Sequence, residues 1–181
     1  MKIAITGHST GLGAEFKSYY ESLGHTVLGF SRRNGYDLRN WAKLQSMLEQ
    51  IKDCDLLISC AKPDFVQTTL LYEIYKLWQG QDKTILNISS ALTYFPTTPP
   101  HLFNDPMMDL YRTSKLSLNE ACAQLSFKSA LPHIILVKPE HLYGKIPSPE
   151  ESIRLTVWVK TLAETLDRAR ENNFSIKEIT F

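Results

Sequence analysis

The sequence has few cysteines, no long hydrophobic run and no excess of charge of either sign. Its three cysteines, Cys54, Cys60 and Cys122, are an odd number without metal-ligand spacing, so they favour reduced thiols in a cytoplasmic protein over disulfides or a metal site. No apolar run approaches about 18 residues and the chain starts directly with a strand-like segment, so neither a membrane span nor a signal peptide is expected. With 20 Lys and Arg against 19 Asp and Glu, a net charge of +1 argues against nucleic-acid and membrane partners.

What the sequence does contain is an alternation of strand-like and helix-like segments. Apolar runs occur at about residues 3–6, 25–30, 55–60, 84–89, 133–138 and 175–181, and helical periodicity follows the first of them and recurs at 41–52, 64–79, 109–130 and 149–171. This alternation predicts an α/β fold in which helices cover both faces of a parallel sheet. Because no linker or repeat interrupts the 181 residues, we expect one domain over residues 1–181.

A glycine-rich turn follows the first strand-like run. It reads Thr6-Gly7-His-Ser-Thr-Gly11-Leu-Gly13, and glycines at the start of a helix let backbone N–H groups approach a pyrophosphate closely. No Gly-Lys-Ser/Thr follows, which excludes a phosphate-loop NTPase. The turn predicts a dinucleotide site, with a tight turn selected only for packing as the alternative.

The segment after the second strand-like run bears on the choice of dinucleotide. An acidic residue there typically binds the ribose hydroxyls of NAD, whereas arginine favours the 2′-phosphate of NADP. The chain has Ser31-Arg32-Arg33 at this place, and charge-assisted hydrogen bonds from guanidinium groups suit a phosphate. NADP(H) is therefore the preferred cofactor and NAD(H) a possible one, unless the two arginines are merely solvated loop charges.

Tyr111 and Lys115 are spaced to lie on one face of a helix. Reduction of a carbonyl leaves an alkoxide that needs a proton, and a phenol is a suitable acid. The pKa of a free phenol is about 10, and a nearby ammonium is expected to lower it toward working pH. The alternative is an exposed amphipathic helix face without catalytic function.

In their order along the chain, the glycine-rich turn, Asn87-Ile-Ser-Ser90 and Tyr111-x-x-x-Lys115 resemble the short-chain dehydrogenase/reductase family over nearly the whole chain. The resemblance implies a Rossmann-type, doubly wound parallel sheet of about seven strands in the order 3-2-1-4-5-6-7, with a minimal edge strand at Tyr36-Asp-Leu38. It also implies that Tyr111 is the acid, that Lys115 modifies its pKa and binds the nicotinamide ribose, and that Ser90 holds the substrate oxygen.

The same resemblance implies a set of cofactor-binding residues. Asp37 and Leu38 match the family's adenine contact, Cys60 and Ala61 lie where the family has Asn-Asn-Ala-Gly, and Pro139 lies where it has Pro-Gly. The residues predicted to bind the cofactor are Thr6, Gly7, Ser9, Thr10, Gly11, Leu12, Gly13, Ser31, Arg32, Arg33, Asp37, Leu38, Cys60, Ala61, Tyr111, Lys115 and Pro139.

Two departures from the family pattern bear on function. The family's fourth catalytic member, an Asn, has no counterpart near residues 63–66, where Asp64 lies closest. The segment from Ser90 to Tyr111 is longer than in most compact members and closer to those acting on nucleotide sugars. We expect an NAD(P)(H)-dependent oxidoreductase of a small carbonyl or alcohol, without a metal, working as a homodimer or homotetramer. The alternatives are a cofactor-binding regulatory protein and a nucleotide-sugar reductase or epimerase.

Overall fold

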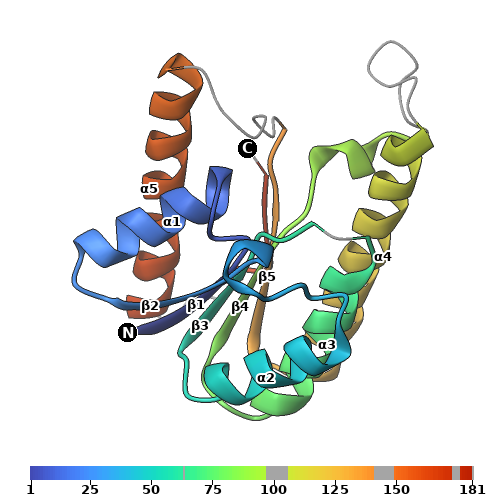
Figure 1. Cartoon of the computed structure of the whole chain (residues 1–181), viewed down its shortest axis with the longest axis horizontal. Coiled ribbons are helices and arrows are strands. Elements are labelled where there is room, and N and C mark those ends of the chain that lie inside the picture. Colours follow the sequence, from blue (N-terminus) through green and yellow to red (C-terminus); the bar gives the residue numbers. More distant parts are fainter. Residues whose placement is uncertain (63, 97–105, 141–148, 173–175, 181) are drawn as a thin grey trace.

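Six parallel strands form the centre of the molecule in a computed structural model that describes residues 1–62, 64–96, 106–140, 149–172 and 176–180 (Figure 1). Their order across the sheet is β2-β1-β3-β4-β5-β6, and every neighbouring pair is parallel. The strands are β1 (Lys2–Thr6), β2 (Thr26–Phe30), β3 (Leu56–Ser59), β4 (Thr84–Ile88), β5 (His133–Lys138) and β6 (Glu178–Thr180). The predicted α/β class and doubly wound parallel sheet are confirmed.

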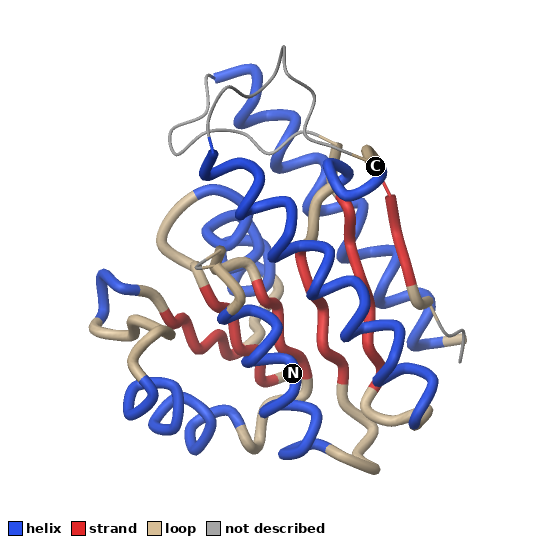
Figure 2. The backbone as a smooth tube through the Cα atoms, turned by 90° about the vertical axis from the view of Figure 1, so that its right-hand side faces the viewer, coloured by secondary structure: helices blue, strands red, loops and turns tan. Residues whose placement is uncertain are grey.

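Helices cover both faces of this sheet, as Figures 1 and 2 show. The α-helices are α1 (Gly11–Ser22), α2 (Trp41–Ile51), α3 (Val66–Trp78), α4 (Pro106–Lys128) and α5 (Pro149–Glu171), and short 3-10 helices lie at η1 (Arg32–Asn34) and η2 (Ala91–Tyr94). Helices α1 and α5 pack on one face, and α2, α3 and α4 pack on the other. No α-helix in the described part of the chain is both long and apolar enough to cross a membrane.

Each face of the sheet has its own hydrophobic core because successive side chains of a strand point to opposite faces. In β1, Ile3 and Ile5 pack with Phe16 and Tyr20 of α1, whereas Ala4 belongs to the core under α2, α3 and α4. A strand that is buried on both faces has a continuous apolar sequence, so these strands could be predicted from the sequence.

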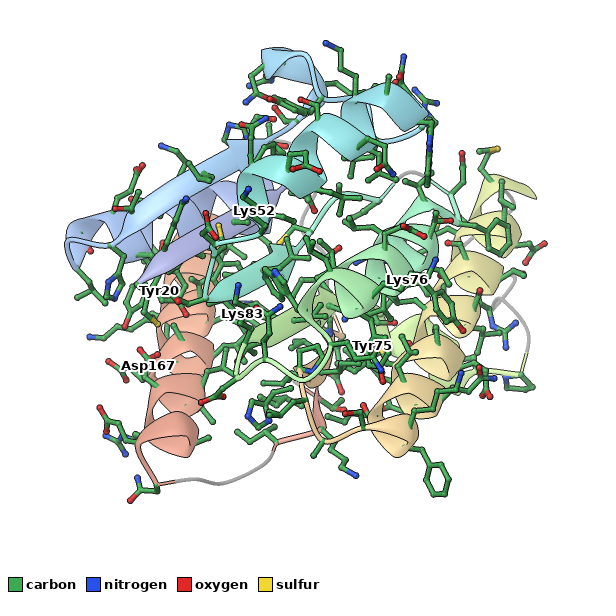
Figure 3. All side chains as sticks on the ribbon, turned by 90° about the horizontal axis from the view of Figure 1, so that it is seen from below. Tyr20, Lys52, Tyr75, Lys76, Lys83 and Asp167 are labelled. Carbon is green, nitrogen blue, oxygen red and sulfur yellow. The ribbon has the colours of Figure 1, made fainter. Side chains whose placement is uncertain are left out.

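The turns that precede β3 and β4 contact each other at the end of the sheet where the strands begin, where Figure 3 labels Lys52 and Lys83. The ammonium of Lys83 donates a hydrogen bond to the backbone oxygen of Lys52 and lies 5.1 Å from the centre of the Trp78 ring. The opposite end, where parallel strands finish, is the end at which α/β sheets bind ligands.

The predicted edge strand at residues 36–38 is absent, so the described residues form a sheet of six strands and not seven. After β2 the backbone N–H of Ser31 donates to the Asn34 side chain, and Gly35 then takes a positive φ of 87°. Leu38 is buried in the core, which draws this segment toward α2. A turn anchored at both ends replaces the strand and its crossover helix.

Candidate functional site

The glycine-rich turn joins β1 to α1 at a very close approach of backbone segments. A Cβ on Gly13 would lie 2.4 Å from the backbone oxygen of Gly7, and a Cβ on Gly7 would lie 2.9 Å from the backbone nitrogen of Ala61. Thr10 occupies the N-cap of α1, but its side chain makes no capping hydrogen bond. The N–H groups of the first helical turn are therefore available to an anionic ligand.

A cavity of about 710 Å³ opens beside this turn. Most of the residues predicted to bind the cofactor line it: Gly7, Ser9, Thr10, Gly11, Leu12, Gly13, Ser31, Arg32, Arg33, Asp37, Leu38, Cys60 and Ala61. Its other lining residues are Phe30, Tyr36, Arg39, Lys62, Asp64, Ile88 and Leu155. Three features fit a dinucleotide with its phosphates. The backbone at Gly7 and Gly13 leaves no room for a Cβ, the start of α1 has no side-chain cap, and guanidinium groups line the cavity.

Four predicted cofactor residues lie outside the lining of this cavity. Thr6 is fully buried, and its hydroxyl accepts a hydrogen bond of 3.2 Å from the Ala61 N–H. The backbone oxygen of Pro139 accepts from the Ala91 N–H at 3.0 Å. Thr6 and Pro139 thus brace neighbouring segments in this structure, and the other two residues, Tyr111 and Lys115, belong to the group described below.

The three arginines of the cavity differ in their partners. Arg33 donates to the backbone oxygen of Ser9 at 3.3 Å, which joins η1 to the glycine-rich turn. Arg39, which sequence reasoning missed, forms a 2.8 Å ion pair with Asp37. Hydrogen bonds from Arg39 hold the Asp37 pKa at about 2. The carboxylate expected to contact adenine is therefore already occupied, and the charge of Arg39 is compensated.

Ser90 and Tyr111, from different elements, meet near the ends of the strands. Ser90 is the N-cap of η2 and accepts a hydrogen bond of 3.2 Å from the Leu92 N–H. The Tyr111 hydroxyl is buried, and the described residues provide it with no hydrogen-bond partner of normal geometry. Burial raises its pKa to about 12, although the Ser90 hydroxyl lies close enough to oppose part of that shift.

Two lysine ammonium groups approach the Tyr111 ring. The Nζ atom of Lys115 lies 5.5 Å from the ring centre, and that of Lys62 lies 5.8 Å from it. Lys115 is buried, and burial followed by the charge of Lys62 lowers its pKa to about 7. Desolvation also lowers the pKa of Lys62, although the residue as a whole is exposed.

These shifts correct the expected electrostatics of the pair. We expected the Lys115 ammonium to lower the Tyr111 pKa, but burial raises the pKa of the phenol, and the opposing influence comes from the Ser90 hydroxyl. At neutral pH the phenol is therefore protonated while the amine is partly deprotonated. Sequence reasoning also missed Lys62, because the resemblance places a glycine at that position.

Gln67, in the first turn of α3, is a further residue that sequence reasoning missed. Its side-chain oxygen accepts a 2.6 Å hydrogen bond from Lys115 Nζ, and its Nε2 donates to the backbone oxygens of Ser59 and Ile88 at 2.7 and 3.1 Å. Asp64, the residue that lay closest by sequence, is exposed and lines the cavity instead. Gln67 follows Asp64 by three residues, but its role depends on the packing of α3 against α4, which the spacing of residues does not indicate.

The neighbouring serine and the cysteines have other surroundings. Ser89 donates a 2.6 Å hydrogen bond to the Asn119 side chain, so its hydroxyl is engaged away from Tyr111. All three cysteines are free, and burial raises the pKa of Cys60 and of Cys122 to about 12. The Cys60 thiol is thus protonated, as expected of a packing residue. Within the described ranges, no group of three or more His, Cys, Asp or Glu residues could hold a metal ion.

The long segment between Ser90 and Tyr111 is described only in part. Tyr94 and Phe95 are exposed, and the Tyr94 hydroxyl donates to Glu178 at 2.8 Å. Residues 97–105 of this segment lie outside the described residues, as do residues 141–148.

No protein-family model matches the chain, and no curated protein matches it in sequence. Solved structures do match its fold. A short-chain dehydrogenase/reductase from Vibrio parahaemolyticus superposes with a TM-score of 0.76 at 16% identity, covering 99% of this chain and 98% of that one. The NADH complex of the 3-alpha-hydroxysteroid dehydrogenase from Pseudomonas sp. B-0831 gives 0.68 at 16% identity, with coverages of 99% and 95%.

A UDP-galactose 4-epimerase also shares the fold, with a TM-score of 0.72 at 13% identity over 100% of this chain and 77% of the epimerase. The architecture of this chain is therefore that of the short-chain dehydrogenases/reductases, and the resemblance seen in its motifs is confirmed at the level of the fold.

Proposed function

We propose that this chain is an NADPH-dependent short-chain dehydrogenase/reductase that reduces the carbonyl group of a small molecule. The observation that carries the proposal is the Tyr111 hydroxyl, which is buried, protonated and without a hydrogen-bond partner of normal geometry among the described residues, with Ser90 close by. A buried polar group without a partner is costly to maintain. A carbonyl oxygen held between the two hydroxyls would satisfy it.

Each residue of this group has a role in the proposed reaction. When bound, the reduced nicotinamide supplies a hydride to the carbonyl carbon. Ser90 donates a hydrogen bond to the carbonyl oxygen, and Tyr111 transfers its hydroxyl proton to that oxygen as negative charge develops there. The product is an alcohol, and Lys115 then stands 5.5 Å from the ring of the phenolate, where its protonated form stabilises the charge.

Charge at one end of the cavity supports NADPH over NADH. Arg32 and Arg33 line the cavity, and neither forms an ion pair among the described residues. Arg32 and the Arg33 N–H groups that do not donate to Ser9 are therefore available to a 2′-phosphate. We also propose that the chain acts as a homodimer or homotetramer in the cytoplasm, in keeping with its free cysteines and with the resemblance to the family.

The proposed function is tested by NADPH oxidation with a panel of aldehydes, ketones and keto-sugars, with NADH in parallel. Tyr111→Phe should lower turnover by at least about 100-fold while NADPH binding persists, because only the acid is removed. The matched control is Tyr72→Phe, since Tyr72 on α3 is half-buried and its hydroxyl donates a 3.4 Å hydrogen bond to Gln124 at the surface.

Three results would contradict this assignment. Undiminished turnover by Tyr111→Phe would show that another group supplies the proton. If the unmodified protein binds NADPH and reduces nothing in the panel, a cofactor-binding regulatory protein becomes the better description. Conversion of a UDP-sugar to its epimer without net NADPH oxidation would instead indicate the nucleotide-sugar alternative.

A further inference from the structure

We propose that Gln67 is a positioning residue that orients the Lys115 amine toward Tyr111. This inference rests on the proposed function only for its catalytic consequence, because the arrangement itself is a set of hydrogen bonds. Both side chains are buried, with 4% of Gln67 and 3% of Lys115 exposed. Gln67 comes from α3 and Lys115 from α4, so the contact joins two helices above the ends of β3 and β4.

The orientation of the Gln67 amide is fixed by its partners. The backbone oxygens of Ser59 and Ile88 can only accept, so the amide nitrogen must face them. The amide oxygen then faces Lys115 Nζ, which donates to it at 2.6 Å. A flipped amide would set its N–H groups against an ammonium and its oxygen against two carbonyls, and every one of these contacts would be repulsive.

Two of the three hydrogen-bonding directions of the Lys115 ammonium are therefore occupied. Nζ donates to the Gln67 amide oxygen and, at 2.7 Å, to the backbone oxygen of Ile88. A tetrahedral nitrogen with two fixed hydrogen bonds has a defined remaining direction. Because Nζ lies 5.5 Å from the centre of the Tyr111 ring, that direction can serve the reaction centre.

Several other groups face Lys115 and also influence whether its amine is protonated. Cys60 and Lys62 approach from the end of β3, Cys122 and Tyr111 belong to α4 itself, and Ile88 offers its carbonyl oxygen from β4. The two thiols are protonated at neutral pH because burial raises the pKa of each to about 12. The charge of Lys62 opposes protonation of Lys115, whereas the Gln67 oxygen favours it as a hydrogen-bond acceptor.

The test measures the titration of Lys115 by NMR of the lysine side-chain resonances, with the Lys115 signal assigned by its loss in Lys115→Met. Gln67→Glu should raise the titration midpoint by about one pH unit or more, because a carboxylate favours the ammonium. Gln67→Leu should lower it, because the acceptor is lost in a buried place. Gln79→Glu and Gln79→Leu are the controls, since Gln79 is exposed at the far end of α3.

Opposite shifts by the two Gln67 variants would support positioning, since mere loosening of the packing would admit water and raise the midpoint in both. Shifts of the same sign, or no shift beyond the controls, would overturn the inference. Activity adds an independent arm: kcat of Gln67→Leu should fall at least about 10-fold, with its pH profile displaced in the direction of the NMR shift. If no variant reduces any carbonyl, the proposed function fails while the NMR titration still decides the role of Gln67.

Discussion

The amine of Lys115 is buried and changes its charge near neutral pH. Burying the charged form lowers the stability of the folded protein. Its pKa falls from an ordinary value of 10.5 to about 7 because burial disfavours the ammonium. Between these values the unfolded chain binds a proton that the folded chain does not, so the stability contribution of Lys115 improves as pH rises from about 7 toward 10.5. Below pH 7 the full cost of burying the charge is present.

We therefore expect Lys115→Met to stabilise the protein more at pH 6 than at pH 8.5, with a difference on the order of 2 kcal/mol between the two pH values. Urea unfolding at both pH values measures it. Lys76→Met, on the exposed face of α3 (Figure 3), is the control and should show no such pH dependence. An equal gain at both pH values would mean that the Lys115 pKa is not depressed.

At the level of single residues, the sequence predicted the groups whose spacing carries chemistry. Tyr111 and Lys115 are one helical turn apart, and the structure places the Lys115 amine 5.5 Å from the centre of the Tyr111 ring and the Ser90 hydroxyl close to that of Tyr111. Gln67 and Lys62 were missed because their contacts depend on where α3 and the end of β3 lie in space. The fall in the Lys115 pKa was also missed, since burial by neighbouring elements cannot be read from residue spacing.

A substitution at the junction between β1 and α1 tests whether the glycine-rich turn forms the proposed dinucleotide site. Gly13→Ala would force a Cβ to within 2.4 Å of the Gly7 backbone oxygen, so the helix must move away from the turn. We expect a loss of about 1–3 kcal/mol in stability together with loss of NADPH binding, measured by urea unfolding and by fluorescence titration.

Gly24→Ala, at the other end of α1, is the matched control for this junction. Gly24 has a φ of +78° but no atom within 4 Å of an added Cβ, so only backbone strain of about 1–2 kcal/mol is expected. NADPH binding should survive this change. Equal loss of binding in both variants would point to general destabilisation of α1, and retained binding in Gly13→Ala would remove the turn from the site.

Helices and strands with a clear hydrophobic pattern could be predicted from the sequence. The segment whose conformation depends on a local turn could not. The runs that became β1, β3, β4 and β5 are apolar because both faces of the sheet are covered. Residues 36–38 look like a short strand by composition, but Tyr36 packs edge-on against Phe30 with ring centres 4.9 Å apart, and a turn at residues 38–40 leads into α2. Tertiary packing decided that segment.

Over the whole molecule, the cavity joins elements that are distant in sequence, so a ligand held there should stabilise the folded state as one unit. Its walls come from the glycine-rich turn, η1, the end of β3 and Leu155 of α5. Binding at 100 times Kd adds about 2.7 kcal/mol, which for a chain of this size raises Tm by about 5–10 °C. NADPH should give such a shift, and NADH at the same concentration a smaller one.

The arginines separate a true NADPH preference from general dinucleotide binding. Loss of a hydrogen bond to a charged phosphate weakens binding by roughly 10-fold or more, so Arg32→Ala or Arg33→Ala should at least halve the NADPH-induced shift and leave the NADH shift unchanged. Arg168→Ala, toward the far end of α5, is the control. Equal shifts by NADPH and NADH in the unmodified protein would assign both arginines to the solvated surface. If neither cofactor moved Tm, the cavity beside the glycine-rich turn would need a different ligand altogether.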